Sequence, residues 1–145
     1  MHWSLTPKAN ARFIGLWLIV GMVLLVLLPP RARIGFGFGG ASLGTVAGWL
    51  QLRSMREAAG ALLAAADALA VRRALASNKW GKRYFVLFWA SQVAMIVAGF
   101  AVLGLRGPAG ALLAYCAFGA TREAVTLAGA RELARAALRP VHPEA

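Results

Sequence analysis

Four long apolar stretches, separated by polar segments, dominate this chain of 145 residues. A helix of about 20 apolar residues crosses a hydrocarbon core about 30 Å thick, and each stretch is of that order. The pattern therefore predicts an all-α integral membrane protein in which four transmembrane helices form two hairpins. The predicted spans are residues 13–30, 34–52, 84–105 and 107–129.

Positive charge is divided unevenly between the two sides of this topology. The chain has 16 Lys and Arg against 5 Asp and Glu, which gives a net charge of +11. With the N-terminus in the cytoplasm, only Arg31, Arg33 and Arg106 fall on the outer side. This is the positive-inside pattern, and it indicates a prokaryotic inner membrane with both termini cytoplasmic. The high charge is thus read as a topology signal and not as a sign of nucleic-acid binding.

A connector over residues 54–77 joins the second and third stretches on the predicted cytoplasmic side. Ser54 and Glu57 have the spacing of a capping box, and the Ala-rich run that follows has a high helix propensity. Two arrangements remain open. The connector is either a separate amphipathic helix at the inner leaflet or a continuation of the second helix. It is too short for a soluble core, so residues 1–145 are predicted to form one domain.

The second stretch is rich in glycine. Gly40, Gly44 and Gly48 recur every four residues and share one helix face, with Ser42 and Thr45 nearby. Such small residues let another helix backbone approach closely. This face is the predicted helix-packing or partner-binding site. The sequence leaves open whether its partner is a helix of this chain, a second copy or another membrane subunit.

Few polar side chains interrupt the predicted spans, and these are the candidates for a polar path or a ligand site: Ser91, Gln92, Tyr115, Arg122 and Glu123. A charge at mid-membrane costs about 2.5–3.5 kcal/mol on insertion scales and marks function by default. The polar stripe on the fourth span would consist of Tyr115, Gly119, Arg122 and Thr126. The structural alternative has Arg122 reaching the headgroups, Glu123 pairing locally and Gln92 bonding another helix.

No catalytic or metal-binding constellation is recognisable. Cys116 is the only cysteine, which excludes an internal disulfide, and His2 and His142 lie in opposite tails. Paired carboxylates, a Ser–His–Asp set and a phosphate-binding glycine loop are all missing from the sequence. We therefore expect no enzymatic activity, no metal and no cofactor. The expected partners are the lipid bilayer and other membrane subunits or a second copy.

The function that fits best is a non-catalytic small membrane subunit, or an assembly or scaffold factor, of a larger membrane complex. It would dock through the glycine-rich helix face. The alternative is a small oligomeric channel or transporter with a polar path near Gln92, Arg122 and Glu123. A membrane-embedded enzyme that holds a lipid phosphate with Arg122 is the least favoured reading.

Overall fold

A computed structural model describes residues 7–64 and 67–137, and every element in these ranges is helical. The all-α fold class is confirmed. The predicted location of the termini falls outside the described residues. The elements are α1 (Pro7–Leu27), α2 (Pro30–Ala64), α3 (Ala68–Ser77), α4 (Lys79–Leu103), the 3-10 turn η1 (Gly104–Arg106) and α5 (Gly107–Ala137).

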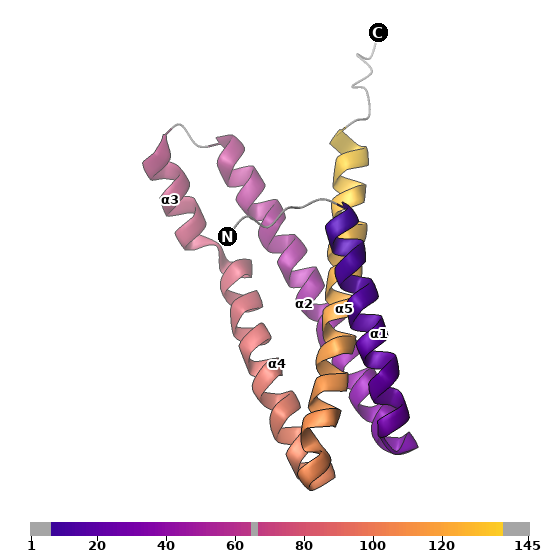
Figure 1. Ribbon diagram of the computed structural model, residues 1–145. Coiled ribbons are helices and arrows are strands. Elements are labelled where there is room, and N and C mark those ends of the chain that lie inside the picture. The colour runs from indigo at the N-terminus through magenta and orange to yellow at the C-terminus, as the bar shows by residue number, and fades with distance from the viewer. Residues whose placement is uncertain (1–6, 65–66, 138–145) are drawn as a thin grey trace.

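The four long helices run alongside one another, with α5 at the centre. α5 packs against α1, α2 and α4, and its contact with α2 is the most extensive in the molecule. The turn between α1 and α2 and the turn at η1 lie at one end of the bundle, whereas α3 lies at the other (Figure 1). α4 and α5 therefore form a packed hairpin, whereas α1 and α2 are joined by a tight turn and each packs against α5.

The first turn is enforced by prolines. Pro29 and Pro30 lack the N–H that a continuing helix would need, so α1 ends at Leu27. Arg33, in the first turn of α2, supplies two donors: its backbone N–H bonds Pro29 O at 3.0 Å, and its side-chain Nε donates to Leu28 O. The first bond opens the hydrogen-bond pattern of α2, and the second supplies a donor to the carbonyl of Leu28, the residue that follows α1. The chain therefore reverses within two residues.

Glycine makes the second turn equally tight. Gly104 has φ 53°, a left-handed conformation that side chains disfavour, and its N–H bonds Phe100 O. A Cβ on Gly107 would lie 2.7 Å from Phe100 N, closer than real Cβ atoms come. The backbones of α4 and α5 therefore meet directly beside η1.

The connector combines the two expectations: its first part continues α2, and its second part is a separate helix, α3. α2 continues without a break to Ala64, so Ser54 lies inside a helix of 35 residues and does not cap a new one. The capping-box prediction for Ser54 is wrong, because the Ala-rich sequence propagates the preceding helix instead of starting another. The break comes near Asp67, whose Oδ1 accepts the Ala70 N–H at 2.7 Å at the start of α3.

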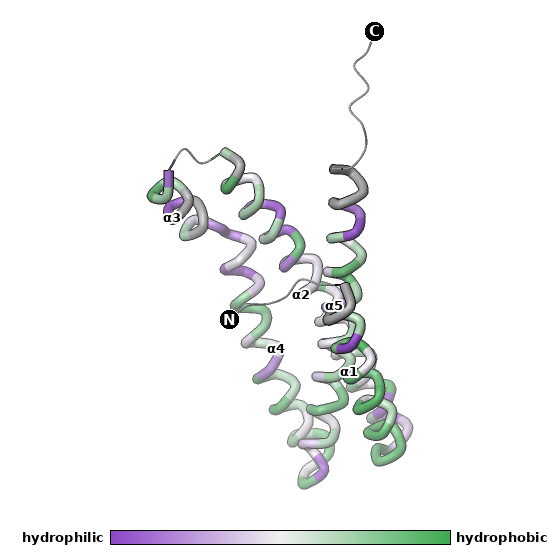
Figure 2. The backbone as a smooth tube through the Cα atoms, turned by 45° about the horizontal axis from the view of Figure 1, so that its top comes forward, coloured by the Kyte–Doolittle hydropathy of each residue, from purple (hydrophilic) through white to green (hydrophobic). Residues whose placement is uncertain are grey.

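Hydropathy varies along the bundle. Hydrophilic colour is most frequent at the end where α3 lies, and hydrophobic colour dominates much of α1 (Figure 2). Among the described residues, one helical segment is long and apolar enough to cross a membrane: Lys79–Glu132, with 54 residues, which contains α4, η1 and most of α5. A shorter apolar helix covers Ala11–Leu27. The four-span topology stays a prediction.

Asn78 fastens the start of α4 to α2. Its side chain is buried, and Oδ1 accepts the Gly81 N–H at 2.7 Å as the N-cap of α4. The Nδ2 group donates to Ser54 O and Ser54 Oγ, each at 3.1 Å. One amide therefore caps one helix and bonds the side of another. Ser54 serves as the acceptor in this contact.

We expect Asn78→Ala to lower the free energy of unfolding by about 2 kcal/mol, because it removes a cap and two hydrogen bonds. Asn78→Asp keeps the capping oxygen but loses the donor to Ser54, so about half of that loss is expected. Denaturation of the detergent-solubilised chain, followed by circular dichroism, measures both. Equal losses in the two variants would contradict a contribution from the cap.

Candidate functional site

The predicted glycine face of α2 lies against α5 of the same chain. A Cβ on Gly40 would come within 2.8 Å of Ala114 Cα, and one on Gly44 within 2.8 Å of Phe118 Cα. At Gly48 the corresponding distance to Arg122 O is 2.9 Å. These positions have no room for a side chain, and none for a second protein. Of the partners that the sequence left open for this face, the structure shows a helix of the same chain, because α5 covers the three glycines.

Ser42 and Thr45, which were grouped with these glycines, lie on the exposed side of α2. Thr45 Oγ1 donates to Ala41 O of its own helix at 2.9 Å. The hydrogen bond that does cross the α2–α5 contact comes from Thr121, whose Oγ1 lies 3.1 Å from Ala41 O. Thr121 was not predicted. Its position in the sequence between Gly119 and Arg122, two residues of the predicted polar stripe, could have indicated a polar contact here.

Arg122 and Glu123 form an ion pair with each other, as the structural alternative proposed. The Arg122 side chain also donates from Nη1 to Tyr84 Oη at 3.2 Å, which ties α5 to α4. Its Cζ lies 6.0 Å from the Phe88 ring centroid. Both charged side chains are less than one-fifth exposed, at 18% and 16%. The pair is therefore held inside the bundle by a phenol and an aromatic ring.

The other polar candidates do not join this pair. Ser91 is buried and donates to Phe88 O within its own helix at 2.8 Å. Tyr115 packs edge-on against Trp17 of α1, with ring centroids 5.0 Å apart. The Gln92 Nε2 atom is buried and has no partner among the described residues. Ser91 and Tyr115 therefore have neighbours other than the Arg122–Glu123 pair.

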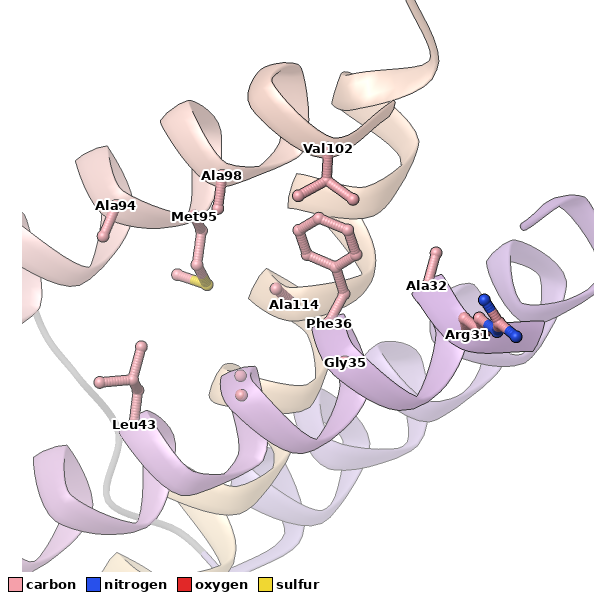
Figure 3. Close-up of a pocket in the computed structure, with 12 residues that line it drawn as sticks. Arg31, Ala32, Gly35, Phe36, Leu43, Ala94, Met95, Ala98, Val102 and Ala114 are labelled. Carbon is pink, nitrogen blue, oxygen red and sulfur yellow. The ribbon is translucent and has the colours of Figure 1, made fainter. Parts of the chain in front are cut away.

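An apolar groove opens between α2 and α4, with α5 as its floor. Its volume is about 420 Å³, and Arg31 is the one charged residue that lines it. Phe36 and Val102 approach each other near one end, and Leu43 and Met95 face each other near the other (Figure 3). The lining residues are Arg31, Ala32, Gly35, Phe36, Gly39, Gly40, Leu43, Ala94, Met95, Ala98, Val102 and Ala114.

Two glycines of this groove differ from those that face α5. Gly35 and Gly39 are one helical turn apart, and a Cβ at either position would meet nothing within 4 Å. Ala94 and Ala98, also one turn apart, line the groove from α4. Both walls therefore present small side chains that no other described part of the chain covers. Sequence reasoning missed this pair, although its four-residue spacing equals that of the Gly40 series.

Apart from Arg31, only apolar residues and glycines line the groove. None of the five polar candidates lines it. Within residues 7–64 and 67–137, no group of three or more His, Cys, Asp or Glu could hold a metal ion. Cys116 is a free thiol buried beside Leu24, Leu28 and Leu113. Such a surface can bind apolar groups by shape, but it offers no catalytic group.

Comparison of the chain with protein-family models, with curated proteins and with solved structures finds no match.

Proposed function

We propose that this protein is a non-catalytic integral membrane subunit or assembly scaffold, and that the groove between α2 and α4 receives one transmembrane helix of a larger membrane complex. The observation that carries the proposal is the pair of small-residue walls, Gly35 with Gly39 and Ala94 with Ala98. In lipid, helices associate through close backbone approach, and small residues make that approach possible. The groove presents such residues from two sides.

Membrane insertion has independent support. The apolar segment Lys79–Glu132 would be about 80 Å long as a straight helix, more than twice the hydrocarbon thickness, and η1 folds it back on itself. Two crossings of the bilayer account for that length. Large apolar side chains also face outward: Val26 is 77% exposed and Phe38 is 75% exposed. Many large apolar side chains are exposed on α1 and α4, and extensive apolar exposure of this kind marks contact with lipid or with another protein.

In this proposal, α1 and the apolar part of α2 form the N-terminal membrane hairpin, and α4 and α5 form the C-terminal one. The turns at Pro29 and η1 then share the outer side, and α3 lies in the cytoplasm together with the ends of α2 and α5. This is the four-helix topology with cytoplasmic termini that the charge pattern predicts. A channel or transporter has less support, because Tyr115 packs against α1, Arg122 bonds Tyr84 of α4, and neither residue lines the groove.

A photo-crosslinking residue at Ala98, on the wall of the groove, tests the proposal in membranes of the source cell. We expect it to capture a single partner protein. The same residue at Gly37, which is outside the groove and has nothing within 4 Å, should not. Gly35→Leu fills the groove and should reduce capture about tenfold, which corresponds to roughly 1.4 kcal/mol. Gly37→Leu is the matched control.

Two results would contradict the docking role. One is equal capture from Ala98 and Gly37, which would indicate random contact in the bilayer. The other is undiminished capture in Gly35→Leu while the variant retains its helical content. Crosslinking to a second copy of the chain would identify the groove as a site of self-association.

A further inference from the structure

α4 begins at the end of the bundle that carries α3 (Figure 1). A second cavity is lined by residues at this start of α4 and by Ser54 of α2. Its volume is about 620 Å³. One part of its wall is polar and basic, and the other part is apolar, so its character changes along the first turns of α4. It is lined by Ser54, Asn78, Gly81, Lys82, Phe85 and Val86.

The surroundings of this cavity concentrate positive charge. Arg53 lies beside two indoles that meet edge-on, with Cζ 4.5 Å from the Trp49 ring centroid and 4.8 Å from the Trp80 ring centroid. Arg83 lies over the same Trp80 ring at 4.9 Å. Cation–π contacts hold both guanidinium groups in place but leave their charges uncompensated. Neither arginine forms an ion pair in the part of the chain that the structure describes.

The N-terminus of α4 adds to this field. The helix dipole places partial positive charge at its first turn, beside Gly81 and Lys82. No carboxylate lines the cavity. An anionic group there would reduce the repulsion among Lys82, Arg53 and Arg83.

The apolar side of the cavity continues down α4. Phe85 is 62% exposed, Val86 is 65% exposed, and Trp89 is 55% exposed one turn below Phe85. Phe85 and Trp89 contact each other edge-on at 6.2 Å. The polar, basic part of the cavity is therefore followed along α4 by the exposed apolar residues Phe85, Val86 and Trp89. A phospholipid likewise has a charged headgroup at one end and hydrocarbon chains that extend from it.

We propose that this cavity binds an anionic phospholipid of the inner leaflet. Its phosphate lies beside the Lys82 ammonium and the Ser54 hydroxyl, and an acyl chain follows Phe85 and Val86. The proposal rests on the membrane placement given under Proposed function, but it does not involve the groove. Arg53 and Arg83, the chain neighbours of Ser54 and Lys82, do not line the cavity but add positive charge next to it. Asn78 keeps Ser54 in position through its two hydrogen bonds.

The test uses the full chain in nanodiscs of equimolar phosphatidylcholine and phosphatidylglycerol, with native mass spectrometry of the lipids that remain bound. We expect the wild type to retain phosphatidylglycerol selectively. Lys82→Gln should bind it about fivefold more weakly, because a cation near an anionic headgroup contributes about 1 kcal/mol. Lys79→Gln removes the same charge one turn away, from a residue that does not line the cavity, and should leave retention unchanged.

Equal losses in the two lysine variants would overturn the proposal, because they would indicate diffuse attraction to the surface charge. Displacement of the bound lipid by inorganic phosphate would overturn it as well, in favour of a free anion. The two proposals fail separately. Selective capture from Ala98 can persist when phosphatidylglycerol selectivity is absent, and selectivity can persist when no partner is captured in the groove.

Discussion

Gly44→Ile is expected to lower the free energy of unfolding by about 3 kcal/mol or more and to separate α2 from α5. A Cβ at this position already overlaps Phe118 Cα at 2.8 Å, and it also meets Phe118 O and Thr121 Oγ1. Two of these atoms are backbone, so the strain cannot be relieved by a rotamer change. The helices would have to move apart, and the bond from Thr121 to Ala41 would break.

Denaturant titration in detergent, followed by circular dichroism and tryptophan fluorescence, measures this loss. Gly37→Ile is the matched control, because Gly37 lies in the same helix and a Cβ there meets nothing within 4 Å. Its effect should remain within about 1 kcal/mol, the range of helix-propensity differences. If both variants unfold at the same denaturant concentration, close packing between α2 and α5 is not what stabilises the bundle.

Arg122→Leu is expected to have the second largest effect, a loss of about 3 kcal/mol of stability. The substitution leaves the Glu123 carboxylate, at 16% exposure, without its partner, and an uncompensated buried charge is strongly destabilising. It also removes the donor to Tyr84, which connects α5 with α4. The same unfolding assay measures the loss.

A comparison of Arg122→Leu with the double variant at Arg122 and Glu123 identifies the cause of that loss. Replacing Arg122 and Glu123 together by leucine removes both charges, so stability should recover by more than half. Tyr84→Phe deletes only the hydrogen bond between helices and should cost roughly 0.6–2 kcal/mol. A double variant that is no more stable than Arg122→Leu would show that the packing of the arginine stem, and not the charge on Glu123, explains the effect.

The helices themselves were predictable from sequence. Apolar stretches long enough for a helix, the prolines at Pro29 and Pro30 and the glycine before Pro108 locate both hairpin turns to within a few residues. The length of α2 was less certain, because an Ala-rich continuation and a new capped helix satisfy the same local propensities. That choice depended on whether Ser54 would cap a helix or accept from Asn78, which is a contact between residues 24 apart.

The site was harder to predict because helix periodicity shows which residues share a face but not which helix packs against that face. Gly40 and Gly39 are adjacent in the chain, yet Gly40 lies against α5 and Gly39 faces the open groove. Which glycine face is covered depends on where α5 and α4 settle around α2. Likewise, the polar residues of α5 share one face in projection, but Tyr115 meets α1 and Arg122 reaches α4.

The central position of α5 also determines when the bundle can close during synthesis. The bond from Thr121 to Ala41 joins residues 80 apart, so α2 is made well before the helix that covers its glycines. At about 5–20 residues per second, translation separates these two partners by roughly 4–16 s. Throughout that interval α5 does not yet cover the face around Gly44. The glycine face of α2 can therefore pair with a wrong helix most easily in the period before α5 has been synthesised.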